Sequence, residues 1–364
     1  MRALAVLSPA LSKKIKAKEK YILEIDSLKI PLALIHVPDT EFDENNPQLD
    51  NAVLVKKVGF SLNYRDQGVI ESAWYKLSKD NQEAYYPIGS EFCGKVVKVG
   101  KKVTNLNIGD HVIANCSYPY APDNVAPGIP SNHASKELEI FHKGKLIKIP
   151  NTIPADQACG MSIGVQTAFS MIRKADIKPG QNVLVTSITS NTSLITLNFL
   201  KNIGCNVYGM SYSTKGINLV KEHFPFVKDI FEFKNLELPQ NLFFDAVIDP
   251  FADTHLKKLQ NHLNFGANYV TCGMYNQSKE KFNSEASLEN LPGLLSGLIS
   301  RNVSLIGNCL GTTEDLETGV NILAKDSDSN IVIDSVFNEN DINTFIEKSF
   351  NKSSYKVGKV ILLY

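Results

Sequence analysis

Several features that define large classes of protein are absent from this sequence of 364 residues. Lys and Arg together number 38, as do Asp and Glu, so the chain has no net charge at pH 7. A neutral chain lacks the positive field that attracts nucleic acid or an anionic membrane, and we expect neither as a partner. No apolar run is long enough to span a bilayer, and Ser8 and Pro9 end the first apolar stretch without a cleavage site. We therefore interpret residues 1–7 as the first β-strand of a cytoplasmic protein.

Paired cysteines are absent too, because none of the six stands in a C-x-x-C spacing. Their absence argues against a zinc ribbon and against a dithiol redox motif. We expect buried free thiols in a reducing compartment instead. The cysteines are Cys93, Cys116, Cys159, Cys205, Cys272 and Cys309.

The first 150 residues have the pattern of a mostly β domain. Short β-branched runs bounded by turn residues predict strands over 52–58, 94–100 and 111–115. The last apolar run, 359–363, is predicted to be a strand that returns to the sheet of this first domain.

After Pro154 the pattern changes to strands that alternate with helices. Residues 155–175 have helical spacing, and a helix over 193–202 joins strands at 182–186 and 206–210 into a βαβ unit. This alternation predicts a parallel, doubly wound sheet. Further strands are predicted over 244–249, 267–271 and 302–306.

Five segments, in this order along the chain, resemble a known family: LNYRD at 62–66, GSEFCGKVVKVG at 89–100, GDHVI at 109–113, VQTAFSMI at 165–172 and KPGQNVLVT at 178–186. Together they resemble the medium-chain dehydrogenase/reductase superfamily, and within it the zinc-free quinone oxidoreductases and enoyl reductases. The resemblance implies an α/β protein, with a mostly β, GroES-like catalytic domain interrupted by a Rossmann domain. We expect the catalytic domain to begin with residues 1–153, the Rossmann domain to span 154–310, and residues 311–364 to return to the catalytic domain.

The residues at the superfamily's zinc positions differ in this chain. Zinc-dependent members place a Cys near Asn63 and Tyr64, and a Gly-His-Glu where this chain has Gly89-Ser90-Glu91. Serine and asparagine do not supply the thiolate or neutral imidazole that zinc requires, and no cysteine quartet for a structural zinc is present. The resemblance therefore implies an enzyme without a metal ion.

The turn after the first Rossmann strand, residues 187–193, contains no glycine. Glycines let the backbone approach a pyrophosphate closely, whereas side chains hold it away. The residues here are small, so they can cap the following helix and donate hydrogen bonds to phosphate oxygens. The alternative is that they only cap the helix and bind nothing. The predicted phosphate-binding residues are Ser187, Ser190, Asn191, Thr192 and Ser193.

The end of the next strand favours NADPH as the cofactor. A carboxylate there would bond the ribose 2′-OH of NAD, but this chain has Ser211, Ser213 and Lys215, which suit a 2′-phosphate. The alternative is that Lys215 is an ordinary exposed lysine. The resemblance also implies that Thr167 and the loops after the later strands line the nicotinamide, although glycines there suit plain turns as well. The loop residues are Cys272, Gly273, Gly307 and Asn308.

The resemblance implies hydride transfer to a C=C bond conjugated with a carbonyl, followed by protonation of the enolate. Tyr64, with Asn63 beside it, is the first candidate for a hydrogen-bond donor or orienting group, and His133 is the candidate proton donor. The alternatives are a half-buried structural tyrosine and a structural or surface histidine. Arg65 and Asp66 are expected to pair with each other.

The motifs NYRD, SNHAS and SNTSL are also similar to a subgroup of these reductases from natural-product pathways. That subgroup includes the lanthipeptide enzymes that reduce dehydroalanine to D-alanine. Three functions stay open: an NADPH-dependent reductase of an activated alkene in a small molecule or modified peptide, a quinone or general enone reductase, and a non-catalytic nucleotide-binding or structural protein. The resemblance further implies a homodimer formed through the strand at 302–306.

Overall fold

The computed structural model describes every residue except 80, 213, 276–290, 327–328 and 351–355. The chain divides into two compact units, one formed by residues 1–163 and 333–364 and the other by residues 164–332. None of the helices formed by the described residues has the length and apolar character needed to cross a bilayer.

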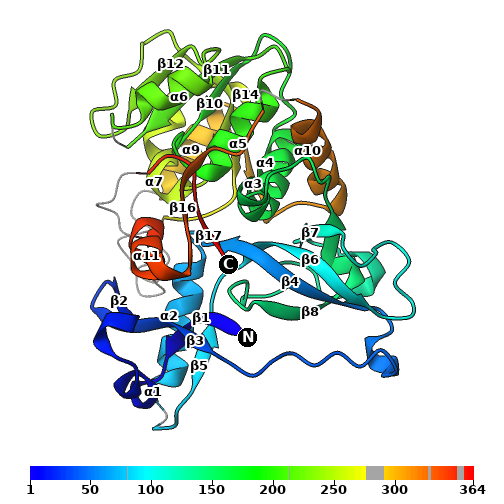
Figure 1. Ribbon diagram of the computed structural model, residues 1–364. Coiled ribbons are helices and arrows are strands. Elements are labelled where there is room, and N and C mark those ends of the chain that lie inside the picture. The colour runs from blue at the N-terminus through cyan, green and yellow to red at the C-terminus, as the bar shows by residue number, and fades with distance from the viewer. Residues whose placement is uncertain (80, 213, 276–290, 327–328, 351–355) are drawn as a thin grey trace. The chain divides into compact units, whose positions relative to one another are not determined.

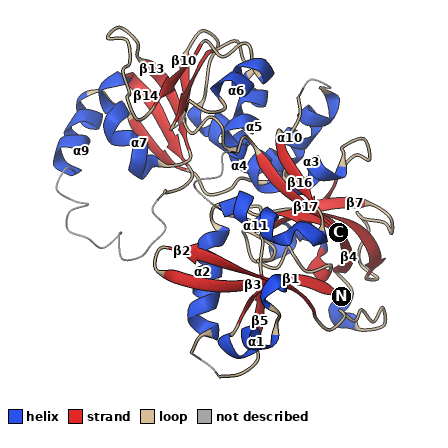
Figure 2. Cartoon of the chain, turned by 60° about the vertical axis from the view of Figure 1, so that its left-hand side comes forward, coloured by secondary structure: helices blue, strands red, loops and turns tan. Residues whose placement is uncertain are grey.

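One sheet of the first unit has four strands in the order β2-β3-β1-β5. Leu4, Ala5 and Val6 in the first strand are completely buried, which explains its unbroken apolar sequence. Figure 2 shows this sheet with helix α2 (Asp66–Leu77) beside it. The strands are β1 (Arg2–Leu7), β2 (Lys20–Ile25), β3 (Leu28–His36) and β5 (Tyr85–Pro87), and helix α1 (Pro9–Lys14) follows β1.

The other sheet of this unit has the order β16-β17-β4-β6-β7-β9, with β8 paired to β4. The last strand pairs antiparallel with β4, with Ile361 opposite Ser61, so the predicted return of the C-terminal strand is confirmed. The register also places Lys359 near Asn63, just beyond the end of β4. The strands are β4 (Ala52–Ser61), β6 (Glu91–Val99), β7 (His111–Ala114), β8 (Leu138–His142), β9 (Leu146–Lys148), β16 (Ile333–Phe337) and β17 (Lys359–Leu363); helix α11 (Ile342–Phe350) lies between the last two.

The second unit is a six-stranded parallel sheet in the order β12-β11-β10-β13-β14-β15, which confirms the doubly wound prediction (Figure 1). The strand order reverses between β10 and β13, and ligands of such sheets bind at this point. The strands are β10 (Asn182–Val185), β11 (Asn206–Ser211), β12 (Asp229–Glu232), β13 (Phe244–Asp249), β14 (Leu263–Thr271) and β15 (Ser304–Gly307). The helices are α4 (Ser162–Ala175), α5 (Asn191–Leu200), α6 (Ile217–His223), α7 (Ala252–Leu259), α9 (Leu291–Ser300) and α10 (Thr313–Lys325).

Two of these elements differ from the sequence pattern. The helix expected over 155–175 is broken into α3 (Ala155–Cys159) and α4. A Cβ at Gly160 would lie 2.7 Å from Lys359 Cγ, so the break lets the last strand pass close to the backbone. The short strand β12 was not predicted, because Asp229 and Glu232 flank only two apolar residues.

The chain also returns to the first unit at residue 333 rather than at 311. Helix α10 stays with the Rossmann sheet because Asp315 receives two hydrogen bonds from Arg173 of α4, at 2.7 and 2.8 Å. Gly319 of α10 lies so close to α4 that a Cβ there would be 2.5 Å from Val165 Cγ1.

Candidate active site and cofactor edge

A buried polar cluster lies in the first unit where four segments meet. Asp66 and Glu91 are 1% and 0% exposed, and Lys359 is 4% exposed. The segments are the turn from β4 into α2, the start of β6, the start of β17 and the junction of α3 with α4. We call Ser61, Asn63, Arg65, Asp66, Ser90, Glu91, Ser162 and Lys359 the polar cluster.

Glu91 is the most heavily bonded residue of the polar cluster. Its Oε2 lies 2.6 Å from Lys359 Nζ, and its Oε1 accepts from the Ile163 backbone N–H at 2.7 Å. The remaining donors are Ser61 Oγ at 3.0 Å, Asn63 Nδ2 at 3.3 Å and Ser162 Oγ at 3.3 Å. Five donors in total therefore hold the two oxygens of this completely buried carboxyl group.

Asn63, predicted as a catalytic donor, uses both ends of its amide within the polar cluster. Its Oδ1 accepts from Lys359 Nζ at 2.7 Å, and its Nδ2 lies 3.3 Å from Ser90 Oγ and from Glu91 Oε2. The ammonium therefore fixes which end of the amide faces the carboxylate, and Asn63 holds the cluster together.

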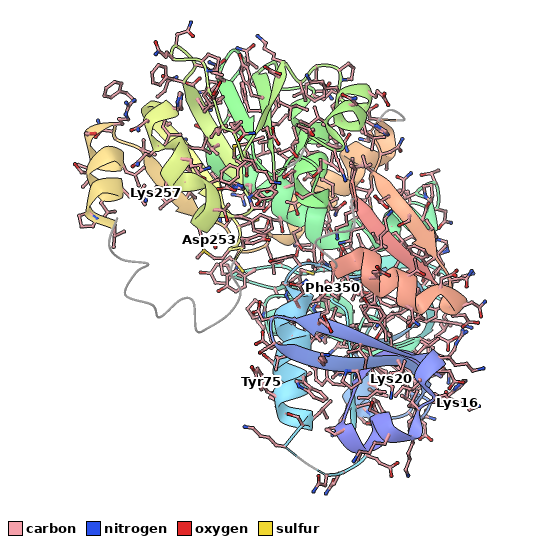
Figure 3. All side chains as sticks on the ribbon, turned by 90° about the vertical axis from the view of Figure 1, so that its left-hand side faces the viewer. Lys16, Lys20, Tyr75, Asp253, Lys257 and Phe350 are labelled. Carbon is pink, nitrogen blue, oxygen red and sulfur yellow. The ribbon has the colours of Figure 1, made fainter. Side chains whose placement is uncertain are left out.

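Asp66 anchors the turn that carries the predicted tyrosine. Its carboxylate accepts from Asn63 N at 2.8 Å and Ser90 Oγ at 3.0 Å, and it pairs with Arg65 at 3.0 Å, which confirms the expected charge pair. Burial raises the pKa of Asp66, while Arg65 and the Asn63 N–H act in the opposite direction. Tyr64 lies in the middle of this turn and is half-buried. Another tyrosine, Tyr75, lies near the C-terminal end of α2, away from this turn, and is 48% exposed (Figure 3).

The loop that carries His133 is tied to the same region. Ala134 N and Ser135 N donate to Gly89 O and Ile88 O, both at 2.9 Å. Gly89 has φ +96°, and a Cβ there would lie 3.1 Å from Ala134 Cβ, so only glycine allows this approach.

The imidazole of His133 lies 4.9 Å edge-to-face from the ring of Tyr86, and its Nδ1 is 3.9 Å from Glu139 Oε1. Burial lowers the pKa of His133, so the ring is neutral at neutral pH and can donate one hydrogen bond. Its Nε2 is buried and meets no hydrogen-bond partner among the described residues. Lys57 is fully buried beside this loop. Its Nζ donates to Glu139 Oε2 at 2.5 Å and to the His133 carbonyl oxygen at 3.1 Å, and these bonds hold the loop in place.

The second unit brings the predicted cofactor residues to one edge of its sheet. Because all six strands are parallel, the segments that follow β10, β11, β14 and β15 lie at the same end. These segments contain Ser187–Ser193, Ser211, Lys215, Cys272, Gly273, Gly307 and Asn308, whereas Ser213 lies outside the described residues.

The glycine-free turn has a defined orientation at this edge. Ile188 is completely buried, and its Cδ1 would lie 2.2 Å from a Cβ at Gly209, so β11 needs a glycine opposite the turn. Ser187 adopts a left-handed φ of +46°. Ser190 caps α5 by accepting from Ser193 N, and the buried Ser193 hydroxyl donates to Thr186 O at 2.8 Å. Ser193 is thus engaged within the turn, while Asn191 and Thr192 stand in the first turn of the helix, where backbone N–H groups suit a phosphate.

Residues 49–151 match the family model of the alcohol dehydrogenase GroES-like domain. The acryloyl-coenzyme A reductase of Metallosphaera sedula is 24% identical over 332 residues, which cover 85% of this chain and 91% of that protein. The quinone oxidoreductase-like protein 2 homolog of Nematostella vectensis is 30% identical over 139 residues, 38% of this chain and 34% of that protein. The solved quinone oxidoreductase of Escherichia coli complexed with NADPH has a TM-score of 0.73 over all of both chains at 14% identity.

These matches agree with the predicted resemblance to the medium-chain dehydrogenase/reductase superfamily, whose fold the chain has. It is an NAD(P)H-dependent oxidoreductase, as predicted, with the GroES-like and Rossmann architecture of that superfamily.

The polar cluster does not fit the catalytic zinc of this superfamily's metal-dependent members. An asparagine and a serine stand at the zinc-ligand positions, and the ammonium of Lys359 already contacts both Asn63 and Glu91. A fixed cation at this place repels a second one. Among the described residues, no three His, Cys, Asp or Glu side chains are arranged to hold a metal ion.

The sequence did not reveal a buried network beneath the turn that follows β10, residues 187–193. Asp249, at the end of β13, accepts from Thr186 Oγ1 at 2.6 Å, from Phe251 N at 2.8 Å and from the hydroxyl of Tyr269, and its Oδ1 lies 2.7 Å from His255 Nδ1. Burial alone would raise the pKa of Asp249, but its partners, His255 foremost, lower it below its ordinary value. The carbonyl oxygen of Thr186 accepts the hydrogen bond from the Ser193 hydroxyl. Because Asp249 accepts from the Thr186 hydroxyl, it supports the turn from the protein interior.

The residues predicted to line the nicotinamide are also held by internal bonds. Asn308 is 6% exposed, its Oδ1 accepts from Ser170 Oγ at 2.8 Å, and its Nδ2 donates to Leu310 O at 2.7 Å. Thr167 of α4 is 5% exposed. Burial, with a contribution from Asp249, raises the pKa of Cys272 to about 12, so its thiol stays protonated.

Replacing Asp249 by Asn should destabilise the protein by about 2–4 kcal/mol at pH 7, because buried donors lose a charged acceptor. A lowered pKa in the folded state contributes stability above the pKa of the unfolded chain and loses it at lower pH. The difference between wild type and D249N should therefore shrink below about pH 4. Urea unfolding at pH 7 and pH 3.5 checks this expectation, and an equal difference at both pH values would contradict it.

Proposed function

We propose that this oxidoreductase is an NADPH-dependent reductase of a C=C bond conjugated with a carbonyl group, working without catalytic zinc. The observation that carries the proposal is the composition of the polar cluster. It offers hydrogen-bond donors beside an ammonium, and it lacks the ligand set needed to bind an alkoxide on zinc. Such donors suit a reaction in which negative charge develops on a carbonyl oxygen.

The comparisons support this reaction class. One relative, which aligns with 85% of this chain, bears the name acryloyl-coenzyme A reductase. Acryloyl thioesters contain a C=C bond conjugated with a carbonyl. The quinone oxidoreductase-like relative and the solved quinone oxidoreductase support the alternative of a quinone or enone reductase. A dehydroalanine residue is an amide-conjugated alkene, so a modified peptide remains a third acceptor class that the same chemistry would reduce.

Bound NADPH would supply a hydride to the β-carbon of the alkene. In this proposal the hydroxyl of Tyr64 orients the carbonyl group, while Asn63 keeps the polar cluster in place. His133 is the candidate that supplies a proton to the α-carbon through Nε2: it would take up a proton from solvent and return to the neutral ring when it delivers it. Thr167 and the loops at Cys272–Gly273 and Gly307–Asn308 would line the nicotinamide.

The purified protein should oxidise NADPH when given an acryloyl thioester, a simple enone or quinone, or a dehydroalanine-containing peptide. We expect the acryloyl thioester to have the highest kcat/KM. NADPH absorbance at 340 nm measures the rate, and product mass should rise by two hydrogens. A protein that binds neither NADPH nor NADH at high micromolar concentrations would favour the non-catalytic alternative.

The preference for NADPH has further support beyond Ser211 and Lys215. A hollow beside the segment that follows β12 is lined by Lys234, Asn235, Leu236, Glu237 and Lys258, so two ammonium groups face one carboxylate there. The Lys234 ammonium lies 4.9 Å from the centre of the Tyr212 ring, directly after β11, and the Lys258 ammonium lies 4.2 Å from the Phe233 ring. We propose that these lysines contribute to binding the 2′-phosphate.

Lys234→Met should weaken NADPH binding about tenfold, because one charge-assisted contact to the 2′-phosphate is lost. NADH binding should change less than about twofold, since NADH lacks that phosphate. Quenching of cofactor fluorescence measures both affinities. Lys257→Met is the matched control: Lys257 lies on α7 beside Lys258 but does not line the hollow (Figure 3). Equal losses for NADPH and NADH would contradict a 2′-phosphate role.

We also propose a homodimer formed through β15, which is an edge strand of the Rossmann sheet. Leu305 on this strand is 49% exposed, and Leu295 and Ile299 on the preceding helix α9 are 45% and 74% exposed. An exposed apolar edge strand is costly in a monomer and suits pairing with a second copy.

Leu305→Lys should shift the protein from dimer to monomer at micromolar concentration, because a charge in the interface is poorly tolerated. Light scattering gives the mass directly. Leu219→Lys, on α6, is the matched control, because Leu219 is 37% exposed on another part of this unit. A monomeric wild type, or a dimeric L305K variant, would argue against this interface.

A further inference from the structure

Lys359 is a buried cation that the sequence patterns did not single out. It stands at the start of the last strand, and its side chain is 5% exposed. Its ammonium has three N–H groups. Two acceptors are provided by the described residues, Glu91 Oε2 at 2.6 Å and Asn63 Oδ1 at 2.7 Å.

We propose that Lys359 is a catalytic residue of the reduction: its third N–H donates to the carbonyl oxygen of the substrate and stabilises the negative charge that develops there. This inference rests on the proposed function, because it requires a substrate whose carbonyl becomes an enolate. It assigns to a side chain of the chain itself the electrostatic role that zinc-dependent members of the superfamily give to a metal ion.

The other groups of the polar cluster are less suited to this role. The amide of Asn63 donates to Ser90 and Glu91, and its oxygen accepts from Lys359. Arg65 directs Nη1 to Asp66 and to Asn132, both at 3.0 Å, and its side chain is 36% exposed, so water screens its charge. Lys359 combines a full charge, burial and an N–H group without an acceptor among the described residues.

The surroundings hold the ammonium in place before any substrate arrives. Glu91 cannot turn away, because Ser61, Ser162 and the Ile163 N–H fix its two oxygens. Gly160 lets the lysine stem pass, since a Cβ there would lie 2.7 Å from Lys359 Cγ. A donor fixed in this way needs no reorganisation as charge develops, which is the condition for effective electrostatic stabilisation.

The reduction balances with Lys359 protonated throughout. Bound NADPH would supply the hydride that forms the C–H bond at the β-carbon, and the π electrons of the C=C bond would pass through the conjugated system to the carbonyl oxygen. The ammonium of Lys359 would hydrogen-bond to this enolate oxygen without transferring its proton. A proton taken from solvent, through His133 as proposed above, would then form the C–H bond at the α-carbon and give the saturated product, with NADP⁺ as the oxidised partner.

The test must separate this role from that of a counter-ion for Glu91. The single variant Lys359→Met should unfold at a lower urea concentration than wild type, because it leaves the buried carboxylate of Glu91 without its ion-pair partner. The double variant E91Q/K359M removes both charges and should regain most of the wild-type urea midpoint and bind NADPH with wild-type affinity. Its kcat with the acryloyl thioester should nevertheless stay about 100-fold below that of wild type. If this double variant does not fold, E91Q/K359Q supplies a second neutral pair with hydrogen-bonding capacity.

Lys145→Met is the matched control for loss of a buried lysine. Lys145 is 8% exposed in the same unit, and its ammonium donates to Gly128 O at 2.7 Å. We expect its kcat to remain within about twofold of wild type, since Gly128 lies outside the polar cluster. A stable double variant with wild-type kcat would overturn the inference and leave the proposed function standing. A wild type that reduces none of the acceptors would overturn both.

Discussion

The ion pair between Glu91 and Lys359 holds together the polar cluster of the first unit. It joins the start of β6 to the start of β17, and these strands come from the two chain segments that the Rossmann unit separates. Losing one partner of such a buried pair costs about 3–5 kcal/mol, whereas replacing both costs much less. The first unit therefore cannot complete its polar cluster until the last strand is in place.

In each unit, a completely buried carboxyl group is held by several hydrogen-bond donors. Glu91 receives donors from the β4 turn, the α3–α4 junction and the last strand, and it thereby fixes Asn63. Asp249 has the corresponding position in the second unit, where it accepts from Thr186 beneath the turn that follows β10. Both carboxylates are shielded from solvent and saturated with donors. In each unit, a candidate site segment is thus supported by a buried carboxyl group that has no contact with solvent.

Sequence patterns predicted the elements that have strong local signals. The Rossmann strands at 182–185 and 244–249 are apolar and short, and the C-terminal strand was expected in the first sheet. The patterns missed β12, because Asp229 and Glu232 break its apolar run. They also missed the partners of Asn63 and Asp249, since Lys359 and Tyr269 lie far away in sequence. A hydrogen bond across such a separation leaves no periodicity that a single sequence can reveal.

A crystal structure of the protein with NADP⁺ and a saturated acyl thioester would test most directly whether Lys359 donates a hydrogen bond to the carbonyl oxygen of the substrate. The account predicts that Lys359 Nζ lies about 3 Å from the carbonyl oxygen of the thioester while keeping its contacts with Glu91 and Asn63. A carbonyl oxygen held by other groups, with Lys359 enclosed behind Glu91 and out of reach, would contradict it.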